Sequence, residues 1–265
     1  MLDLVNVRKT FNRHTINEKI ALAGVNLHLE DGDFVTVIGG NGAGKSTTLN
    51  AIAGVWPIDE GQISIDGQDI THLSEHRRAG LLGRVFQDPM TGTAANMQIE
   101  ENLALAARRG QSRTLRAGIT KAERVEYREK LKMLGLGLED RMTTKVGLLS
   151  GGQRQALTLL MATLKKPKLL LLDEHTAALD PRTAEKVLQL SNQIIQENNL
   201  MTMMVTHNMR DAIAYGNRLI MMHEGRIILD IRGEEKKHLT VDMLLEQFAK
   251  VSGEEFANDR ALLTK

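Results

Sequence analysis

The sequence predicts an α/β fold with a mainly parallel sheet whose faces are covered by helices. Three short apolar runs, 34–38, 169–172 and 201–205, are predicted to be buried strands. Helices are expected between them, over 45–53 and 181–198. Strands that alternate with helices form parallel sheets, because each crossover helix returns the chain to the same edge of the sheet.

The segments outside this alternation predict further parts of the molecule. Residues 1–38 carry additional strand patterns, and 218–231 is predicted to form a β-hairpin. Residues 88–165 place glutamate, arginine and alanine at helical spacing, which predicts a mostly helical lobe. The expected division of a single domain 1–265 is a core over 1–87 and 166–232, a helical subdomain over 88–165 and a C-terminal helical extension over 233–265.

The composition excludes several functional classes. Among 265 residues, 34 Lys and Arg face 33 Asp and Glu, so no electrostatic footprint for nucleic acid exists and no nucleic-acid partner is expected. The sequence contains no cysteine, which removes disulfides, thiolate nucleophiles and cysteine-based zinc sites. The longest apolar run, 169–172, is far shorter than the roughly 18 apolar residues of a membrane helix. If the protein works at a membrane, another chain must span it.

A glycine-rich stretch between a predicted strand and a predicted helix gives the first chemical signal. It matches G-x-x-x-x-G-K-[ST] in the strand–turn–helix context that this pattern requires. Glycines let the backbone wrap closely around phosphates, and a helix N-terminus favours anions. We expect Lys45 to bring its charge to the β- and γ-phosphates and the Ser46 hydroxyl to ligate Mg²⁺. This phosphate loop, predicted to bind ATP, comprises Gly39, Gly40, Asn41, Gly42, Ala43, Gly44, Lys45, Ser46 and Thr47.

A second motif distinguishes among the nucleotide-binding classes. No Asn-Lys-x-Asp motif is present, which argues against a GTPase. The stretch 149–153, Leu-Ser-Gly-Gly-Gln, is followed by Arg154 and Gln155 and strongly resembles the signature motif of ABC ATPases. The order and spacing of further motifs resemble that family from residue 1 to about residue 232. The resemblance implies a P-loop NTPase core with an N-terminal antiparallel β subdomain and an inserted helical subdomain.

The resemblance also assigns roles outside the phosphate loop. Asp173 and Glu174 look like the end of the Walker B strand, which implies a Mg²⁺ ligand and a general base, respectively. His207 resembles the switch histidine and is implied to be catalytic. Gln87 resembles the Q-loop glutamine, a metal ligand. Phe11 stands where the family usually places an aromatic residue that stacks on adenine.

Each of these residues has an ordinary alternative. Asp173 could be an N-cap at a strand–helix turn, and Glu174 a surface acid. His207 could be a capping or core histidine, and Phe11 a simple core aromatic. The methionines of 201–204 are interpreted as core packing.

The sequence departs from the family pattern at two places. Proline commonly follows the Walker B glutamate, but His175 stands there. Its imidazole could be catalytic, although we favour a role in backbone spacing. The helix after the signature is more apolar than usual over 156–162, which is expected to alter packing rather than chemistry.

The resemblance implies hydrolysis by a head-to-tail homodimer. Two ATP molecules would lie at its seam, each between the phosphate loop of one subunit and the signature of the other. Closure would drive an integral membrane permease from the cytoplasmic face of the membrane. Residues 88–97 are the candidate permease contact, with Met97 as its anchor; a solvated loop is the alternative, and the basic loop 108–116 is the next candidate. The signature residues that face the partner's ATP are Ser150, Gly151, Gly152 and Gln153.

Two stretches, 91–97 and 173–180, look like a little-described importer subgroup. Its members pair with a permease of the branched-chain amino acid type and a solute-binding lipoprotein, and some are linked to aromatic amino acids. We therefore expect import of a small solute such as an amino acid. An exporter subunit and a soluble ABC ATPase without transport remain alternatives. The sequence carries neither the long insertion of DNA-repair types nor the second cassette of translation-factor types.

Overall fold

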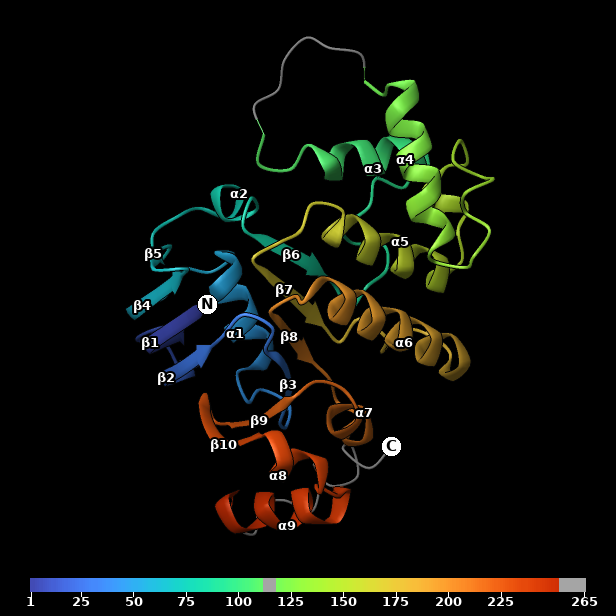
Figure 1. The fold of residues 1–265 in the computed structure, drawn as a ribbon. Coiled ribbons are helices and arrows are strands. Elements are labelled where there is room, and N and C mark those ends of the chain that lie inside the picture. Colours follow the sequence, from blue (N-terminus) through green and yellow to red (C-terminus); the bar gives the residue numbers. More distant parts are fainter. Residues whose placement is uncertain (112–117, 253–265) are drawn as a thin grey trace. The chain divides into compact units, whose positions relative to one another are not determined.

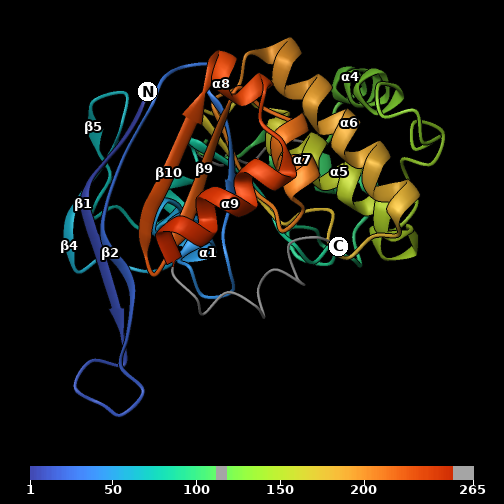
Figure 2. The same cartoon turned by 90° about the horizontal axis from the view of Figure 1, so that it is seen from below.

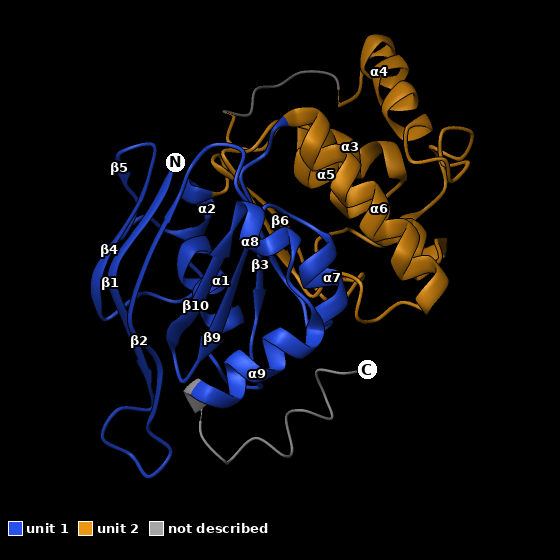
Figure 3. Cartoon of the chain, turned by 60° about the horizontal axis from the view of Figure 1, so that its bottom comes forward, with its two compact units in different colours: residues 1–78, 199–265 blue, residues 79–198 orange. Residues whose placement is uncertain are grey.

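The computed structural model describes residues 1–111 and 118–252 (Figure 1). The chain divides into two compact units. Unit 1 comprises residues 1–78 and the chain from 199 onward, and unit 2 comprises 79–198 (Figure 3). Part of the basic loop 108–116 and the end of the predicted C-terminal extension lie outside the described residues. Within the described ranges, no helix combines the length and the apolar character of a membrane span.

The first part of unit 1 is an antiparallel sheet with the strand order β2-β1-β4-β5. Strand β1 pairs with β2 from Leu2 opposite Leu29 to Phe11 opposite Lys19, and with β4 on its other side. The loop between β1 and β2 projects from the end of this pair (Figure 2). The strands are β1 (Leu2–Phe11), β2 (Lys19–Leu29), β4 (Glu60–Ile65) and β5 (Gln68–Asp69).

Unit 1 also contains the strand order β10-β9-β3-β8. Strand β3 runs parallel to β8 and β9, and β10 completes an antiparallel hairpin with β9, as the sequence predicted. Every residue of β3 is buried, and so are Met203 and Met204 of β8, which confirms core packing for the methionine-rich strand. Because β3 and β8 are parallel, the turns that follow them leave the same edge. The strands are β3 (Phe34–Ile38), β8 (Thr202–Val205), β9 (Arg218–His223) and β10 (Arg226–Arg232).

The helices of unit 1 were predicted in part. Helix α1 has the predicted bounds and ends where Gly54 takes a left-handed conformation with φ 80°. Helix α9 begins at Val241 as expected, and its Leu244 and Phe248 pack in one cluster with Leu219 of β9. Helices α2 and α7 were not predicted, because helices this short show no clear periodicity, and α8 lies within the predicted helical extension without having been placed as a separate helix. The helices are α1 (Lys45–Ala53), α2 (Glu75–Arg78), α7 (Met209–Ala214), α8 (Gly233–Lys237) and α9 (Val241–Ser252).

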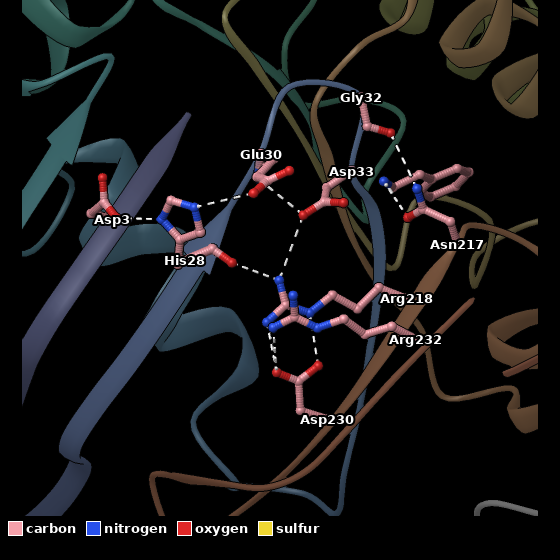
Figure 4. Close-up of polar contacts among 10 residues, drawn as sticks. Asp3, His28, Glu30, Gly32, Asp33, Asn217, Arg218, Asp230 and Arg232 are labelled. Atoms are coloured by element: carbon pink, nitrogen blue, oxygen red, sulfur yellow. Dashed lines mark hydrogen bonds and ion pairs between the residues drawn. The ribbon is translucent and has the colours of Figure 1, made fainter. Parts of the chain in front are cut away.

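A polar network joins the strands of unit 1 at the start of β3 (Figure 4). The Arg218 side chain is 3% exposed and donates to both Asp230 carboxylate oxygens, at 2.8 and 2.6 Å. It also donates to the His28 carbonyl oxygen at 2.6 Å, and the Asp33 carboxylate lies 3.6 Å away. A buried guanidinium needs such partners, because a buried charge without them is strongly destabilising. The phosphate loop follows the other end of β3, so this network supports the sheet rather than the site.

Unit 2 combines a parallel strand pair with α-helices. Val85 of β6 lies opposite Leu172 of β7, and helix α6 has the bounds that the sequence predicted. Leu103 of α3, Leu131 of α4 and Leu157 of α5 are fully buried in one cluster, as expected for a helical lobe. The elements are β6 (Leu82–Val85), α3 (Ile99–Ala107), α4 (Lys121–Lys132), the 3-10 helix η1 (Val146–Leu148), α5 (Gly151–Thr163), β7 (Leu169–Asp173) and α6 (Pro181–Asn198).

Candidate nucleotide-binding site

The phosphate loop connects β3 to α1, and the conformations of its glycines shape it. Gly39, Gly42 and Gly44 have φ angles of 147°, 77° and 103°. A Cβ at Gly39 would lie 2.1 Å from the Met222 carbonyl oxygen, so only glycine fits without a backbone shift. Backbone of this kind turns successive N–H groups toward one concave side, which favours an anion.

The turn of the β9–β10 hairpin supports the phosphate loop. The Gly225 N–H donates to the Ala43 carbonyl oxygen at 3.0 Å, and the Gly225 carbonyl oxygen accepts from the Ala23 N–H at 2.9 Å. A Cβ at Gly44 would approach the Gly225 Cα to 3.2 Å, so loop and turn are in close backbone contact. The sequence does not predict this support, because backbone groups supply it and no side-chain pattern marks it.

Lys45 begins α1 and lies across the phosphate loop. Its side chain is buried, and its Nζ donates to the carbonyl oxygens of Gly39 at 2.7 Å and Gly40 at 3.0 Å. The charge is therefore held inside the loop, where phosphate oxygens would be its natural partners. Ser46 and Thr47 are half-buried in the same helical turn, whose N–H groups have no carbonyl four residues earlier inside the helix.

The end of β1 brings the Phe11 ring, and the start of β2 brings Lys19, into this part of unit 1, where Trp56 lies between α1 and β4. Phe11 is half-buried, and its ring meets Trp56 edge to face with 4.9 Å between the centroids. Lys19 pairs with Phe11 across the strands, and its Nζ lies 2.7 Å from where a Cβ on Gly42 would be. In the part of the chain that the structure describes, the Lys19 ammonium makes no hydrogen bond or ion pair. Lys19 and Trp56 were not predicted from the sequence, because neither belongs to a motif.

His207 leaves the sheet of unit 1 at the same edge as the phosphate loop. The Thr206 N–H donates to the Val37 carbonyl oxygen at 3.1 Å, so the segments after β8 and β3 start side by side. The His207 side chain is half-buried. Unit 1 therefore contains the predicted phosphate loop, Phe11 and one of the two catalytic candidates.

Unit 2 contains the remaining candidates. Asp173 ends β7 and Glu174 follows it, whereas Gln87 comes shortly after β6. Because β6 and β7 are parallel neighbours, Gln87 and Glu174 leave the same edge of this strand pair. Asp173 and Glu174 are half-buried, and Gln87 is exposed. Glu174 has a φ angle of 47°, an uncommon left-handed conformation for a residue with a side chain.

A buried glutamine holds the chain just before Gln87. Gln155 is fully buried on α5, and its side-chain nitrogen donates to the Phe86 carbonyl oxygen at 2.9 Å. Within unit 2, this bond connects helix α5, which begins at the signature, with the residue directly before Gln87. The sequence marked Gln155 only as part of the signature stretch. Its position directly before the apolar stretch 156–162 of the same helix was the available signal.

The signature forms the N-terminus of α5. The Ser150 Oγ accepts from the Gln153 N–H at 3.3 Å, and the Gln153 side chain accepts from the Ser150 N–H at 3.2 Å, which is a capping box. A Cβ at Gly152 would lie 2.2 Å from the Thr183 methyl of α6, so helix packing requires glycine there. Ser150 and Gly151 are exposed at a helix N-terminus, a position that favours an anion.

His175 is enclosed within unit 2. Its side chain is 1% exposed, and its Nε2 lies 3.0 Å from the Ser191 Oγ of α6. Burial lowers the pKa of His175 from 6.5 to about 4, so the imidazole is neutral at physiological pH. An enclosed ring without access to a water molecule favours the backbone-spacing role over the catalytic one.

The implied Mg²⁺ ligands are oxygen donors. Ser46 of unit 1 offers a hydroxyl, and Gln87 and Asp173 of unit 2 offer an amide and a carboxylate. Over residues 1–111 and 118–252, no group of three or more His, Cys, Asp or Glu could hold a metal ion. A site with few protein oxygen ligands suits Mg²⁺. This ion commonly retains several water ligands and is also coordinated by the phosphates of the substrate.

Comparison with known proteins identifies the family. The ABC transporter profile matches residues 22–177. This chain belongs to the ABC transporter family. It is 44% identical to a tyrosine transport ATP-binding protein of Clostridioides difficile over 94% of this chain and 98% of that protein. It is 33% identical to the spermidine/putrescine import protein PotA of Hahella chejuensis over 85% of this chain, and it spans 57% of that longer relative.

Solved ABC cassettes share the fold. The dimeric post-hydrolysis state of MJ0796 bound to ADP and Pi superposes with a TM-score of 0.74 at 31% identity, over 88% of this chain and 98% of that one. The ADP conformation of MJ1267 superposes with a TM-score of 0.75 at 27% identity, over 96% of this chain and 99% of that one. The predicted α/β cassette fold is confirmed. The chain is thus an ABC ATP-binding subunit and an ATPase of the kind that is coupled to transport.

Proposed function

We propose that this ABC subunit energises the import of a small solute such as an amino acid through a separate integral membrane permease. The observation that carries the proposal is the 44% identity, over nearly the full length of both chains, to a protein named for tyrosine transport. Other relatives are named for methionine and polyamine import. The subunit acts at the cytoplasmic face of the membrane, with a solute-binding protein on the other side. Tyrosine and related aromatic amino acids are the first solutes to test.

The nucleotide-binding roles that the motifs imply are part of this proposal. Phe11 stacks on adenine, and Lys45 and the glycine backbone of the phosphate loop hold the β- and γ-phosphates. Ser46, Gln87 and Asp173 are the residues that would hold Mg²⁺, and the ion would neutralise phosphate charge. The positive φ angles of the loop and the buried position of the Lys45 ammonium support the phosphate-binding roles.

Hydrolysis requires a base and a partner subunit. Glu174 accepts a proton from the attacking water, and His207 donates a hydrogen bond to the terminal phosphate. In a head-to-tail homodimer, residues 150–153 of one copy bring the N-terminus of α5 to the ATP held by the other. The exposed Ser150 and Gly151, together with the likeness to dimeric MJ0796, support this arrangement.

The segment 88–97 of unit 2 is the proposed permease contact. It is an ordered loop, because Asn102 bonds both the N–H and the carbonyl oxygen of Ala94, at 2.8 and 3.2 Å. Met90 is 56% exposed, whereas Met97, the anchor expected from the sequence, is half-buried. The apolar side chain that this loop presents to a partner is therefore Met90.

A matched pair of variants tests the ATPase roles. Lys45→Ala should lose ATP affinity, because it deletes the charge that faces the phosphates. Glu174→Gln should keep ATP affinity, lose turnover and accumulate as an ATP-bound dimer in gel filtration, since an amide cannot act as a base. Normal turnover by the Glu174→Gln variant would remove Glu174 from its role.

Reconstitution with a co-expressed permease and solute-binding protein in vesicles tests the transport role. Tyrosine uptake should require ATP and stop with either variant. Met90→Asp should leave the ATPase rate of the isolated subunit unchanged, while uptake and co-purification with the permease are lost. ATP hydrolysis without uptake of any amino acid by the wild-type complex would contradict amino acid import. Full uptake by the Met90→Asp complex would place the permease contact elsewhere.

A further inference from the structure

The residues after the Walker B strand form a tight turn with His175 as its second residue. The Ala177 N–H donates to the Glu174 carbonyl oxygen at 2.9 Å, which closes a β-turn over 174–177. Glu174 has a left-handed φ of 47°, a conformation that costs a residue with a side chain about 1 kcal/mol. Such a conformation persists only where the surrounding structure holds it.

The His175 side chain supplies this support from within unit 2. The Ser191 hydroxyl donates its only proton to the Val187 carbonyl oxygen at 2.7 Å. The Nε2 of His175, 3.0 Å from the same Oγ, must therefore carry a proton and donate it. This bond fixes the tautomer and the ring orientation, and it connects the turn with the middle of α6.

We propose that His175 is a positioning residue: its buried hydrogen bond to Ser191 holds the 174–177 turn, and with it the Glu174 carboxylate, in the orientation that hydrolysis requires. The proposal rests on the assignment of Glu174 as the general base. It also accounts for the departure from the family pattern. Proline, common at this position in the family, suits the second position of a β-turn because its ring fixes φ near −65°. His175 holds the same turn through a distant helix instead.

Two single variants and their combination test the bond. His175→Ala and Ser191→Ala should each lower kcat about tenfold or more, because a small misplacement of a catalytic group has effects of this size. KM for ATP should stay within about twofold, because the phosphate loop is unchanged. The double variant should be no slower than His175→Ala, since the same bond is lost only once.

Two rescue variants distinguish positioning from general packing. His175→Gln retains a side-chain N–H donor, and His175→Pro restrains the turn directly, so both should keep most of the wild-type kcat. Thr163→Ala is the matched control, because the Thr163 hydroxyl also bonds a carbonyl four residues earlier, that of Leu159 at 2.9 Å, on another helix of unit 2. It should turn over at the wild-type rate. All rates are measured well below the unfolding temperature of each variant.

The outcomes separate this inference from the proposed catalytic role. If Glu174→Gln is inactive while His175→Ala and Ser191→Ala keep the wild-type kcat, the positioning role is wrong and the base assignment stands. An equal fall in kcat for Thr163→Ala would also overturn the positioning role, because it would show a general loosening of unit 2. Normal turnover by Glu174→Gln would overturn both. A selective fall in kcat, rescued by His175→Gln or His175→Pro, supports the inference.

Discussion

The phosphate loop of unit 1 and the turn after β7 in unit 2 are held in different ways. Glycines with positive φ angles shape the loop, and the backbone of Gly225 supports it. The turn contains no glycine, and a hydrogen bond from the His175 side chain connects it with Ser191, 16 residues further along the chain. A loop held by backbone is encoded in a short local motif. A turn held by a side chain depends on how a distant helix packs. The following predictions test that contrast, from the largest expected effect to the smallest.

Gly39→Ala should have the largest effect. The new Cβ would meet the backbone oxygen of Met222, which cannot move without shifting β9, so we expect a loss on the order of 4 kcal/mol of unfolding free energy. Gly67→Ala is the control, because Gly67 has a φ of 75° but open space around it; its cost should be about 1 kcal/mol. Denaturant unfolding measures both. Equal losses would show that backbone conformation, rather than close approach, makes glycine necessary at residue 39.

The buried state of His175 predicts a pH dependence of stability. Its folded pKa of about 4 lies below the ordinary 6.5, so the neutral ring favours the folded state above pH 6.5. This contribution, about 3 kcal/mol in full, is lost as the pH falls from 6.5 toward 4. Unfolding free energies of the wild type and His175→Gln, measured across this range, should converge as the pH drops. Parallel curves would mean that the imidazole is not buried as described.

Ser150→Ala should cost about 1 kcal/mol of stability, because it removes one half of the capping box of α5. Thr120 caps α4 with the same kind of box, so Thr120→Ala is a matched control with a similar stability loss. Only Ser150→Ala should also slow ATP hydrolysis, since Ser150 is proposed to contact the ATP of the partner subunit. Equal ATPase rates in the two variants would confine Ser150 to helix capping.

Lys19→Ala should have the smallest effect. An exposed ammonium beside Gly42 is expected to add a salt-sensitive attraction for phosphate, so its loss should weaken ATP binding about two- to fivefold at low ionic strength. Lys237→Ala, an exposed lysine paired with Glu234 in the same unit, should leave binding unchanged. Trp56 is the only tryptophan and contacts the Phe11 ring, so its fluorescence can report binding. Unchanged affinity for the Lys19→Ala variant would exclude this role.

Much of the fold followed from the sequence, because its signals are local. The bounds of α1 and α6 were predicted from periodicity and from the Gly and Pro residues near them, and both agree with the structure. The short helices α2 and α7 were missed, since a segment of one or two turns shows no repeat, and α8 was predicted only as part of the helical extension 233–265. The site residues were placed by motif, and the structure shows which of them share a unit.

The sequence by itself determined the ABC family, the α/β fold and the phosphate loop, because spacing and glycine content specify them within a few residues of chain. The tertiary structure decided that His175 is neutral and bonded to Ser191, that Gly225 supports the loop, and that Met90 is the exposed methionine of its segment. Each of these depends on contacts between residues far apart in the chain or on burial by them. Burial and long-range hydrogen bonds arise only when the chain is packed, so no local pattern records them.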